Sequence, residues 1–66
     1  MKIYDFTEPE LRRFREECNF TDDELQCFNL KAKNKSIIEI SMIMNISESQ
    51  VSALTKRIKR KIIRIV

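Results

Sequence analysis

A six-residue pattern, Asn-x-Ser/Thr-x-x-Glu/Gln, occurs three times in this 66-residue chain, as NFTDDE from residue 19, NKSIIE from residue 34 and NISESQ from residue 45. In a capping box, a Ser or Thr side chain accepts a hydrogen bond from the backbone N–H three residues on, and Glu or Gln there reaches back. Each pattern therefore predicts the start of a helix. Thr7 and Glu10 have the spacing of a fourth capping box. Pro9, which lies between them, is compatible with a helix start because proline is tolerated in the first helical turn.

The asparagine that opens each pattern predicts the end of the preceding helix. Helices commonly end at a residue with positive φ, a conformation that glycine adopts most readily and asparagine next. The chain contains no glycine, so Asn19, Asn34 and Asn45 are the candidates for these positions. The stops and starts together predict four helices joined by short turns, at about residues 7–18, 21–33, 36–44 and 47–64.

The apolar residues recur at helical spacing, and no segment alternates convincingly enough to be a strand. The predicted inward residues are Leu11, Phe14 and Cys18 in the first helix, Leu25, Phe28 and Ala32 in the second, Ile40, Ile43 and Met44 in the third, and Val51, Leu54 or Thr55, Ile58 and Ile62 in the fourth. A turn of about three residues makes the third and fourth helices cross steeply, as in a helix-turn-helix unit. The sequence therefore predicts an all-α fold, a single small four-helix domain over residues 1–66 with an extra helix in front of the helix-turn-helix.

The net charge of +3 is unevenly distributed along the chain. Residues 1–30 carry four Lys or Arg against eight Asp or Glu, a net of −4, whereas residues 31–66 carry nine against two, a net of +7. Clustered positive charge gains free energy by releasing counterions from phosphate. A polyanion is therefore the expected partner of the second half.

Several classes of function find no support in the composition. Two cysteines, Cys18 and Cys27, and no histidine argue against a disulfide framework or a zinc site, and no set of catalytic residues or cofactor-binding motif is present. The N-terminus MKIYDF lacks the long apolar run of a signal peptide, and no stretch reaches the roughly 20 apolar residues of a membrane span. We expect a cytoplasmic protein that is not an enzyme, has no cofactor or metal and does not span a membrane.

From Phe20 to Ile62 the sequence resembles the helix-turn-helix domain of LuxR/GerE-type transcription regulators and the similar region 4 of sigma-70 factors. The landmarks follow in order without a gap: Phe20-Thr21, Glu24, Phe28, Ala32, Ser36, Glu39-Ile40, Met44, Ile46-Ser47-Glu48, Val51, Ile58 and Lys61-Ile62. Where the family usually has glycine, this chain has Asn34 and Asn45. The resemblance implies a transcription regulator that binds double-stranded DNA in a sequence-specific way, with the helix from Ser47 in the major groove.

By analogy with the family, the exposed start of this last helix would read bases. The implied base contacts are Ser49, Ser52, Ala53 and Lys56. The implied phosphate contacts are Lys33, Lys35, Gln50, Arg57, Lys59 and Arg60, with the backbone N–H groups at Ser36 and Ser47, where helix N-termini attract anions.

Other interpretations remain open at this stage. Basic residues near a helix C-terminus also complement the helix dipole, and solvated basic faces are common. The fold is also compatible with a protein-interaction module that docks on RNA polymerase or another regulator, or with a homodimer, through the apolar tail Ile62, Ile63, Ile65 and Val66. That tail would alternatively cover Leu11 and Phe14, and a membrane-surface helix over residues 56–66 is the weakest option.

Overall fold

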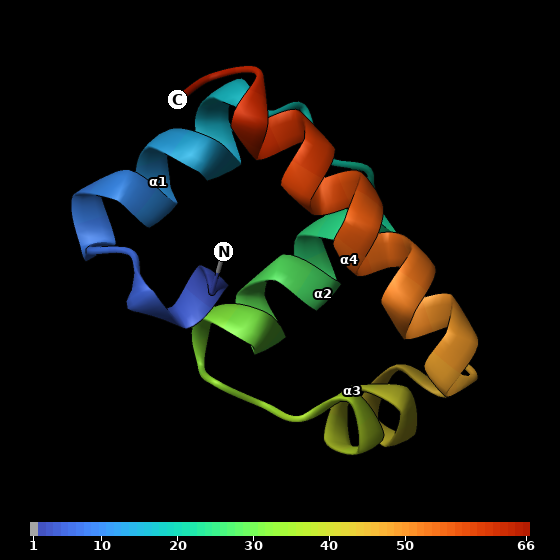
Figure 1. Cartoon of the computed structure of the whole chain (residues 1–66). Helices are drawn as coiled ribbons and strands as arrows, with labels where there is room; N and C mark the ends of the chain where they lie inside the picture. Colours follow the sequence, from blue (N-terminus) through green and yellow to red (C-terminus); the bar gives the residue numbers. More distant parts are fainter. Residues whose placement is uncertain (1) are drawn as a thin grey trace.

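The computed structural model describes residues 2–66, which are folded into helices (Figure 1). One turn of 3-10 helix, η1 (Ile3–Asp5), precedes α1 (Glu8–Glu17), α2 (Asp22–Ala32), α3 (Ile37–Met44) and α4 (Glu48–Ile63), and these described residues contain no β-strand. The all-α prediction is confirmed. Each helix differs from its predicted range by at most one residue at either end, because the predicted ranges counted the capping residues.

The predicted starts and stops are present in the backbone. At the start of α2, the N–H of Thr21 donates to the Glu24 carboxylate at 3.0 Å, and the N–H of Glu24 donates to the Thr21 hydroxyl at 3.3 Å. The boxes at Ser36 and Ser47 close in the same two directions. The stops at Asn19, Asn34 and Asn45 have φ of 53°, 61° and 56°, in the left-handed region. The interpretation of each asparagine as the end of a helix is therefore confirmed.

The core lies between α2 and α4, with α1 and α3 packed at its edges (Figure 1). Its buried apolar residues are Ile3, Leu11, Phe14, Cys18, Cys27, Phe28, Ile40, Val51, Leu54, Ile58 and Ile62. Most of these were predicted from helical spacing. The rings of Phe6 and Phe20, each just before a capping threonine, lie 4.9 Å and 5.0 Å from the rings of Phe14 and Phe28.

One predicted core position, Ile43, is wrong, because this residue is 52% exposed. Leu25, Ala32 and Met44 are partly buried, and of these Ala32 and Met44 pack against the core cluster. Almost every residue of α3 is apolar, so its sequence does not determine which side packs inward, and contact with the neighbouring helices selects Ile40 instead. In α2 the inward side is centred on Cys27 and Phe28, which turns Leu25 toward the edge.

The segment before α1 has a structural role that the sequence did not indicate. η1 packs against α2, and Ile3 is only 3% exposed. The N–H groups of Asp5 and Phe6 donate to the carbonyl oxygens of Lys2 and Ile3 at 3.1 Å and 3.3 Å, which closes the turn. The first residues described are therefore part of the fold.

The third and fourth helices meet as a helix-turn-helix. α3 ends at Met44 and α4 begins at Glu48, so three residues, Asn45 to Ser47, separate the two helices. Figure 1 shows α3 lying across the N-terminal end of α4 instead of running beside it. This arrangement leaves one long side of α4 in contact with the core and the other side uncovered.

Candidate nucleic-acid interface

Helix α4 has one buried side and one exposed side. Val51, Ile58 and Ile62 have no exposed surface and Leu54 is 9% exposed, at spacings of three and four residues that place them on one side of the helix. Asn45 and the cap at Ser47 fix where the helix begins. The opposite side of α4 faces solvent.

The four base-contact candidates lie on this solvent-facing side. Ser49, Ala53 and Lys56 are exposed and Ser52 is partly exposed. They follow one another over two turns, away from the buried stripe, so the structure brings them together on one surface. Ser49, Ser52 and Ala53 have small side chains that leave room for a close approach, and Lys56 is the long side chain among the four.

The phosphate candidates on α4 surround these residues. Arg57 and Arg60 are exposed, Lys59 is partly buried on one edge of the helix, and Gln50 borders a shallow hollow on the other edge. Within residues 2–66, no carboxylate lies within 4.0 Å of the amino or guanidinium groups of these cations or of Lys56. Their charges are therefore available to an external anion.

The turn between α2 and α3 carries the remaining basic candidates. Lys33 is the C-cap of α2 and is exposed. Lys35 is partly buried, and its ammonium lies 3.9 Å from the Glu39 carboxylate in an exposed pair one helical turn apart. Such pairs contribute little free energy, so Glu39 offsets the charge of Lys35 without removing it.

The backbone N–H groups of the two serine caps already have hydrogen-bond partners within the molecule. The backbone N–H of Ser36 donates to Glu39 at 3.2 Å, and the N–H of Ser47 donates to the Gln50 side chain at 3.0 Å. The hydrogen bonds from Ser36 hold the pKa of Glu39 below its usual range. An anion at either helix start would therefore meet the N–H groups of the next two residues, which a capping box leaves without partners.

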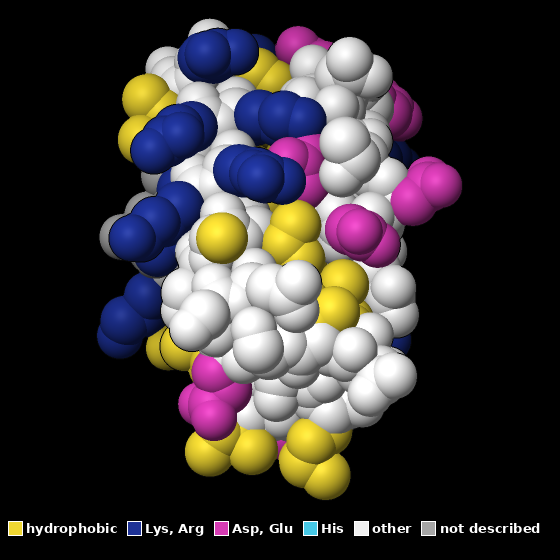
Figure 2. Space-filling model, turned by 90° about the vertical axis from the view of Figure 1, so that its right-hand side faces the viewer, with side chains coloured by type: hydrophobic (Ala, Val, Ile, Leu, Met, Phe, Trp, Pro, Cys, Tyr) yellow, Lys and Arg dark blue, Asp and Glu magenta, His cyan; other side chains and the backbone are white. Residues whose placement is uncertain are grey.

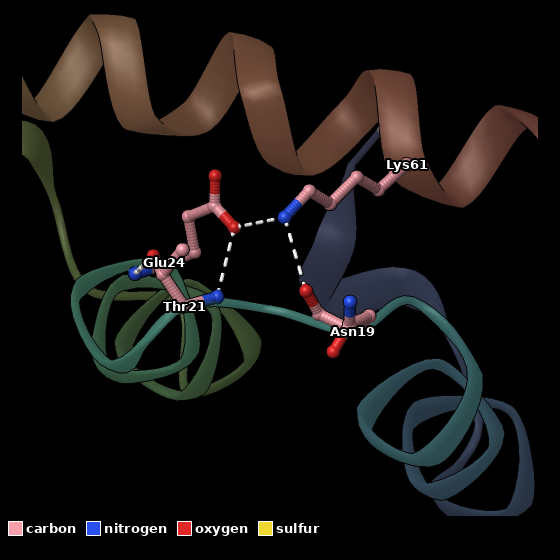
Figure 3. Close-up of polar contacts among 4 residues, drawn as sticks. All are labelled: Asn19, Thr21, Glu24 and Lys61. Atoms are coloured by element: carbon pink, nitrogen blue, oxygen red, sulfur yellow. Dashed lines mark hydrogen bonds and ion pairs between the residues drawn. The ribbon is translucent and has the colours of Figure 1, made fainter.

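One basic residue of α4 is bound inside the molecule, as Figure 3 shows. The ammonium of Lys61 donates to the carboxylate of Glu24 and, at 3.1 Å, to the carbonyl oxygen of Asn19. The Glu24 side chain is 3% exposed and that of Lys61 27%. The Lys61 ammonium also lies 5.9 Å from the centre of the Phe20 ring. This cluster fastens the last turns of α4 to the start of α2.

The ionisation of Glu24 follows from these contacts. Burial raises the pKa of the carboxyl, but the hydrogen bonds from Lys61 and Thr21 and the charge of Lys61 outweigh burial, so the net pKa lies below the ordinary value of 4.5. Glu24 is therefore a carboxylate at neutral pH. Lys61 thus has a carboxylate partner, whereas the exposed cations of α4 have none within 4.0 Å in the part of the chain that the structure describes.

The sequence analysis missed this ion pair although a signal was present. Glu24 lies four residues before Phe28, and Lys61 lies between residues of the buried stripe of α4, so helical spacing turns both charges toward the core. Opposite charges on the inward edges of two helices indicate that each needs a partner. A local sequence pattern does not show that Glu24 and Lys61 are partners, because they are 37 residues apart in the chain.

Cations and anions are largely separated on the face of the molecule that Figure 2 draws. Figure 2 shows Lys and Arg side chains along one side of the view, with most Asp and Glu side chains on the other side and hydrophobic ones at the end formed by α3. The exposed apolar residues of α3 are Ile37, Ile38, Met42 and Ile43. On this face, most Asp and Glu side chains therefore lie apart from the row of Lys and Arg side chains.

The remaining features of the described residues are two buried thiols, and neither a metal-binding cluster nor a membrane-spanning helix is found among these residues. In residues 2–66, no group of three Cys, Asp or Glu side chains is arranged to hold a metal ion. Cys18 and Cys27 are free thiols, and burial raises the pKa of each. Across the same residues, no helix combines the length and the apolar composition that crossing a membrane requires.

Comparison with known proteins identifies the family of this chain. Neither a curated protein nor a solved structure matches it. A family model does match: GerE, the bacterial regulatory proteins of the luxR family, over residues 19–63. The matched segment begins at the asparagine before α2 and ends at the last residue of α4, and thus contains the helix-turn-helix. Because the match spans more than half of the chain, the protein belongs to the luxR family of DNA-binding bacterial transcription regulators.

Proposed function

We propose that the chain binds double-stranded DNA in a sequence-specific way as a small transcription regulator, with α4 in the major groove. The observation that carries this proposal is the outward side of α4, where Lys56, Arg57 and Arg60 are exposed with no acidic partner among residues 2–66. An uncovered row of cations on a helix that projects from the fold is the surface a phosphate backbone attracts. The role is binding and not catalysis.

The proposed contacts divide by side-chain chemistry. Ser49 and Ser52 can donate or accept at base edges, Ala53 can contact a thymine methyl group, and Lys56 can donate to guanine. The cations Lys33, Lys35, Arg57, Lys59 and Arg60 bind phosphate, together with the Gln50 amide and the helix starts at Ser36 and Ser47. Because the base-reading surface is small, one copy discriminates modestly between sequences.

Titration of a labelled duplex at several salt concentrations tests this proposal. With roughly five phosphate contacts, the logarithm of the association constant falls against the logarithm of salt with a slope near −4.5. Selection from a random duplex library then supplies the preferred site and shows whether it is palindromic. The proposal fails if the folded protein does not bind duplex DNA even at low salt.

A second candidate function is a protein-interaction module that docks on RNA polymerase or another regulator. The exposed apolar residues of α3 favour it, since Met42 is 75% and Ile38 60% exposed. The C-terminal tail contributes less than the sequence suggests, because Ile62 is buried and only Ile63 and Val66 are largely exposed.

A homodimer would also raise DNA affinity by joining two weak half-sites. Sedimentation of the chain alone and with polymerase separates these partners.

A further inference from the structure

A hollow of about 230 Å³ lies beside α4, between η1, the end of α2 and the turn that follows. Four lysines from these separate elements line it: Lys2, Lys31, Lys35 and Lys59. None of the described residues that line it is acidic. We refer to these four residues as the lysine hollow.

The lysine hollow exists because the N-terminal segment is fixed in place. Ile3 is buried in the core, and the ring of Phe6 packs edge-on against Phe14 at 4.9 Å. Lys2 is thus adjacent to an anchored residue, and its carbonyl oxygen accepts the hydrogen bond that closes η1. The segment that supplies Lys2 lies outside residues 19–63, which the luxR family model matches.

The positive charges in the lysine hollow are largely uncompensated. Lys31 and Lys59 are partly buried, and within residues 2–66 no carboxylate lies within 4.0 Å of either ammonium or of that of Lys2. Among the residues described, Lys35 alone of the four has a carboxylate within 4.0 Å, that of Glu39 at 3.9 Å. Four lysines around one hollow make its local potential positive, so an anion in the hollow is attracted and can accept charge-assisted hydrogen bonds from the surrounding ammonium groups.

The position of the hollow indicates where this anion comes from. Ser52, Thr55 and Lys59 follow one another at spacings of three and four residues and form one edge of α4. Ser52 is a proposed base contact, whereas Thr55 and Lys59 line the hollow. A DNA strand at the rim of a groove occupied by α4 would therefore pass over the lysine hollow.

We propose that the lysine hollow binds a phosphate group of the DNA backbone, and that the N-terminal segment thereby adds a contact from outside the family domain. This inference rests on the proposed function and extends it to Lys2. The hollow positions the protein on DNA without reading sequence, because phosphate contacts carry no base information.

The test measures duplex affinity against salt for Lys2→Ala and for Arg12→Ala, a matched control. Arg12 is an exposed cation of α1 outside the hollow, and within residues 2–66 it has no acidic partner within 4.0 Å. Loss of one phosphate contact makes the log–log slope shallower by about 0.9, which weakens binding about eightfold at 0.1 M salt. We expect this change for Lys2→Ala on preferred and random duplexes alike, near-wild-type binding for Lys2→Arg, and less than a twofold change for Arg12→Ala.

Three outcomes would overturn the inference. If Lys2→Ala and Arg12→Ala weaken binding equally, the hollow makes no contact although the proposed function stands. If the wild-type protein binds no duplex, the proposed function fails and the inference fails with it. If inorganic phosphate shifts the amide resonances of Lys2, Lys31 and Lys59 at constant ionic strength while Lys2→Ala leaves the salt slope unchanged, the hollow is a site for a free phosphate and not for DNA.

Discussion

Basic residues on two sides of α4 have different roles: one holds the helix against α2, and the others face solvent. On the edge that faces α2, Lys61 is paired with the buried carboxylate of Glu24 and with the carbonyl oxygen of Asn19. On the outward side, Lys56 and Arg60 are exposed and have no acidic partner among residues 2–66. A run of basic residues in a helix therefore mixes structural cations with cations available to a ligand, and the direction of each side chain separates them.

The largest effect expected from this comparison is on stability. Lys61→Ala leaves the buried Glu24 carboxylate without its partner, which costs about 3 kcal/mol in the free energy of unfolding. Lys56→Ala removes the same charge from the exposed side and changes stability by less than about 0.5 kcal/mol. Urea denaturation measures both variants, and equal losses would show that the two lysines are equivalent.

A smaller effect is expected from acid. Because the folded-state pKa of Glu24 is lowered, its contribution to stability is complete above the ordinary value of 4.5 and is lost as pH falls through the folded-state pKa. Glu24→Gln lacks this charge at every pH, so the stability gap between wild type and variant narrows below about pH 4.5. Thermal unfolding from pH 7 to pH 2 follows the gap. A gap that stays constant would show that the ion pair does not contribute.

A smaller loss of stability is expected from a substitution at Asn45, in the turn between α3 and α4. Asn45 has φ of 56°, so Asn45→Ala places a β-carbon in the left-handed region at a cost of about 1 kcal/mol. Asn45→Gly keeps that conformation accessible and is expected to be neutral or slightly stabilising. Chemical denaturation compares the two variants, and an alanine variant as stable as the glycine one would remove the role of the positive φ.

An effect of similar size, on DNA binding and not on stability, separates two cations on the outward side of α4. Lys56→Ala is expected to weaken a preferred site about fivefold more than random DNA, or about 1 kcal/mol of discrimination, because Lys56 contacts a base. Arg60→Ala weakens both duplexes alike, because it contacts phosphate. Competition binding with the two duplexes measures the ratio. The division of roles is wrong if both variants change that ratio equally.

The helices and their ends were predictable because each depends on neighbouring residues. The box of Ser47 and Gln50 and the stop at Asn45 involve atoms within a few residues of one another, so a local pattern in the sequence identifies them. The inward stripe of α4 was equally clear, since polar residues occupy its other sides. The stripe also predicted which residues of α4 face solvent, which is most of the candidate site.

The remaining features could not be predicted because they depend on distant contacts. α3 is apolar on nearly every side, so only its packing decides that Ile40 is buried and Ile43 exposed. η1 has a hydrophobic residue of its own, Ile3, but its place against α2 requires the assembled core. The lysine hollow follows from that docking, since its lysines come from separate elements.

By itself the sequence determined where each helix begins and ends, which side of α4 packs inward, and the luxR-type helix-turn-helix, because capping and helical period act over one or two turns of chain. Only the tertiary structure decided that Lys61 is held by Glu24 while Lys56 and Arg60 remain open, and that Lys2 joins the edge of α4. The physical reason is that a charge acquires its partner, and a side chain its burial, from residues that only folding brings near.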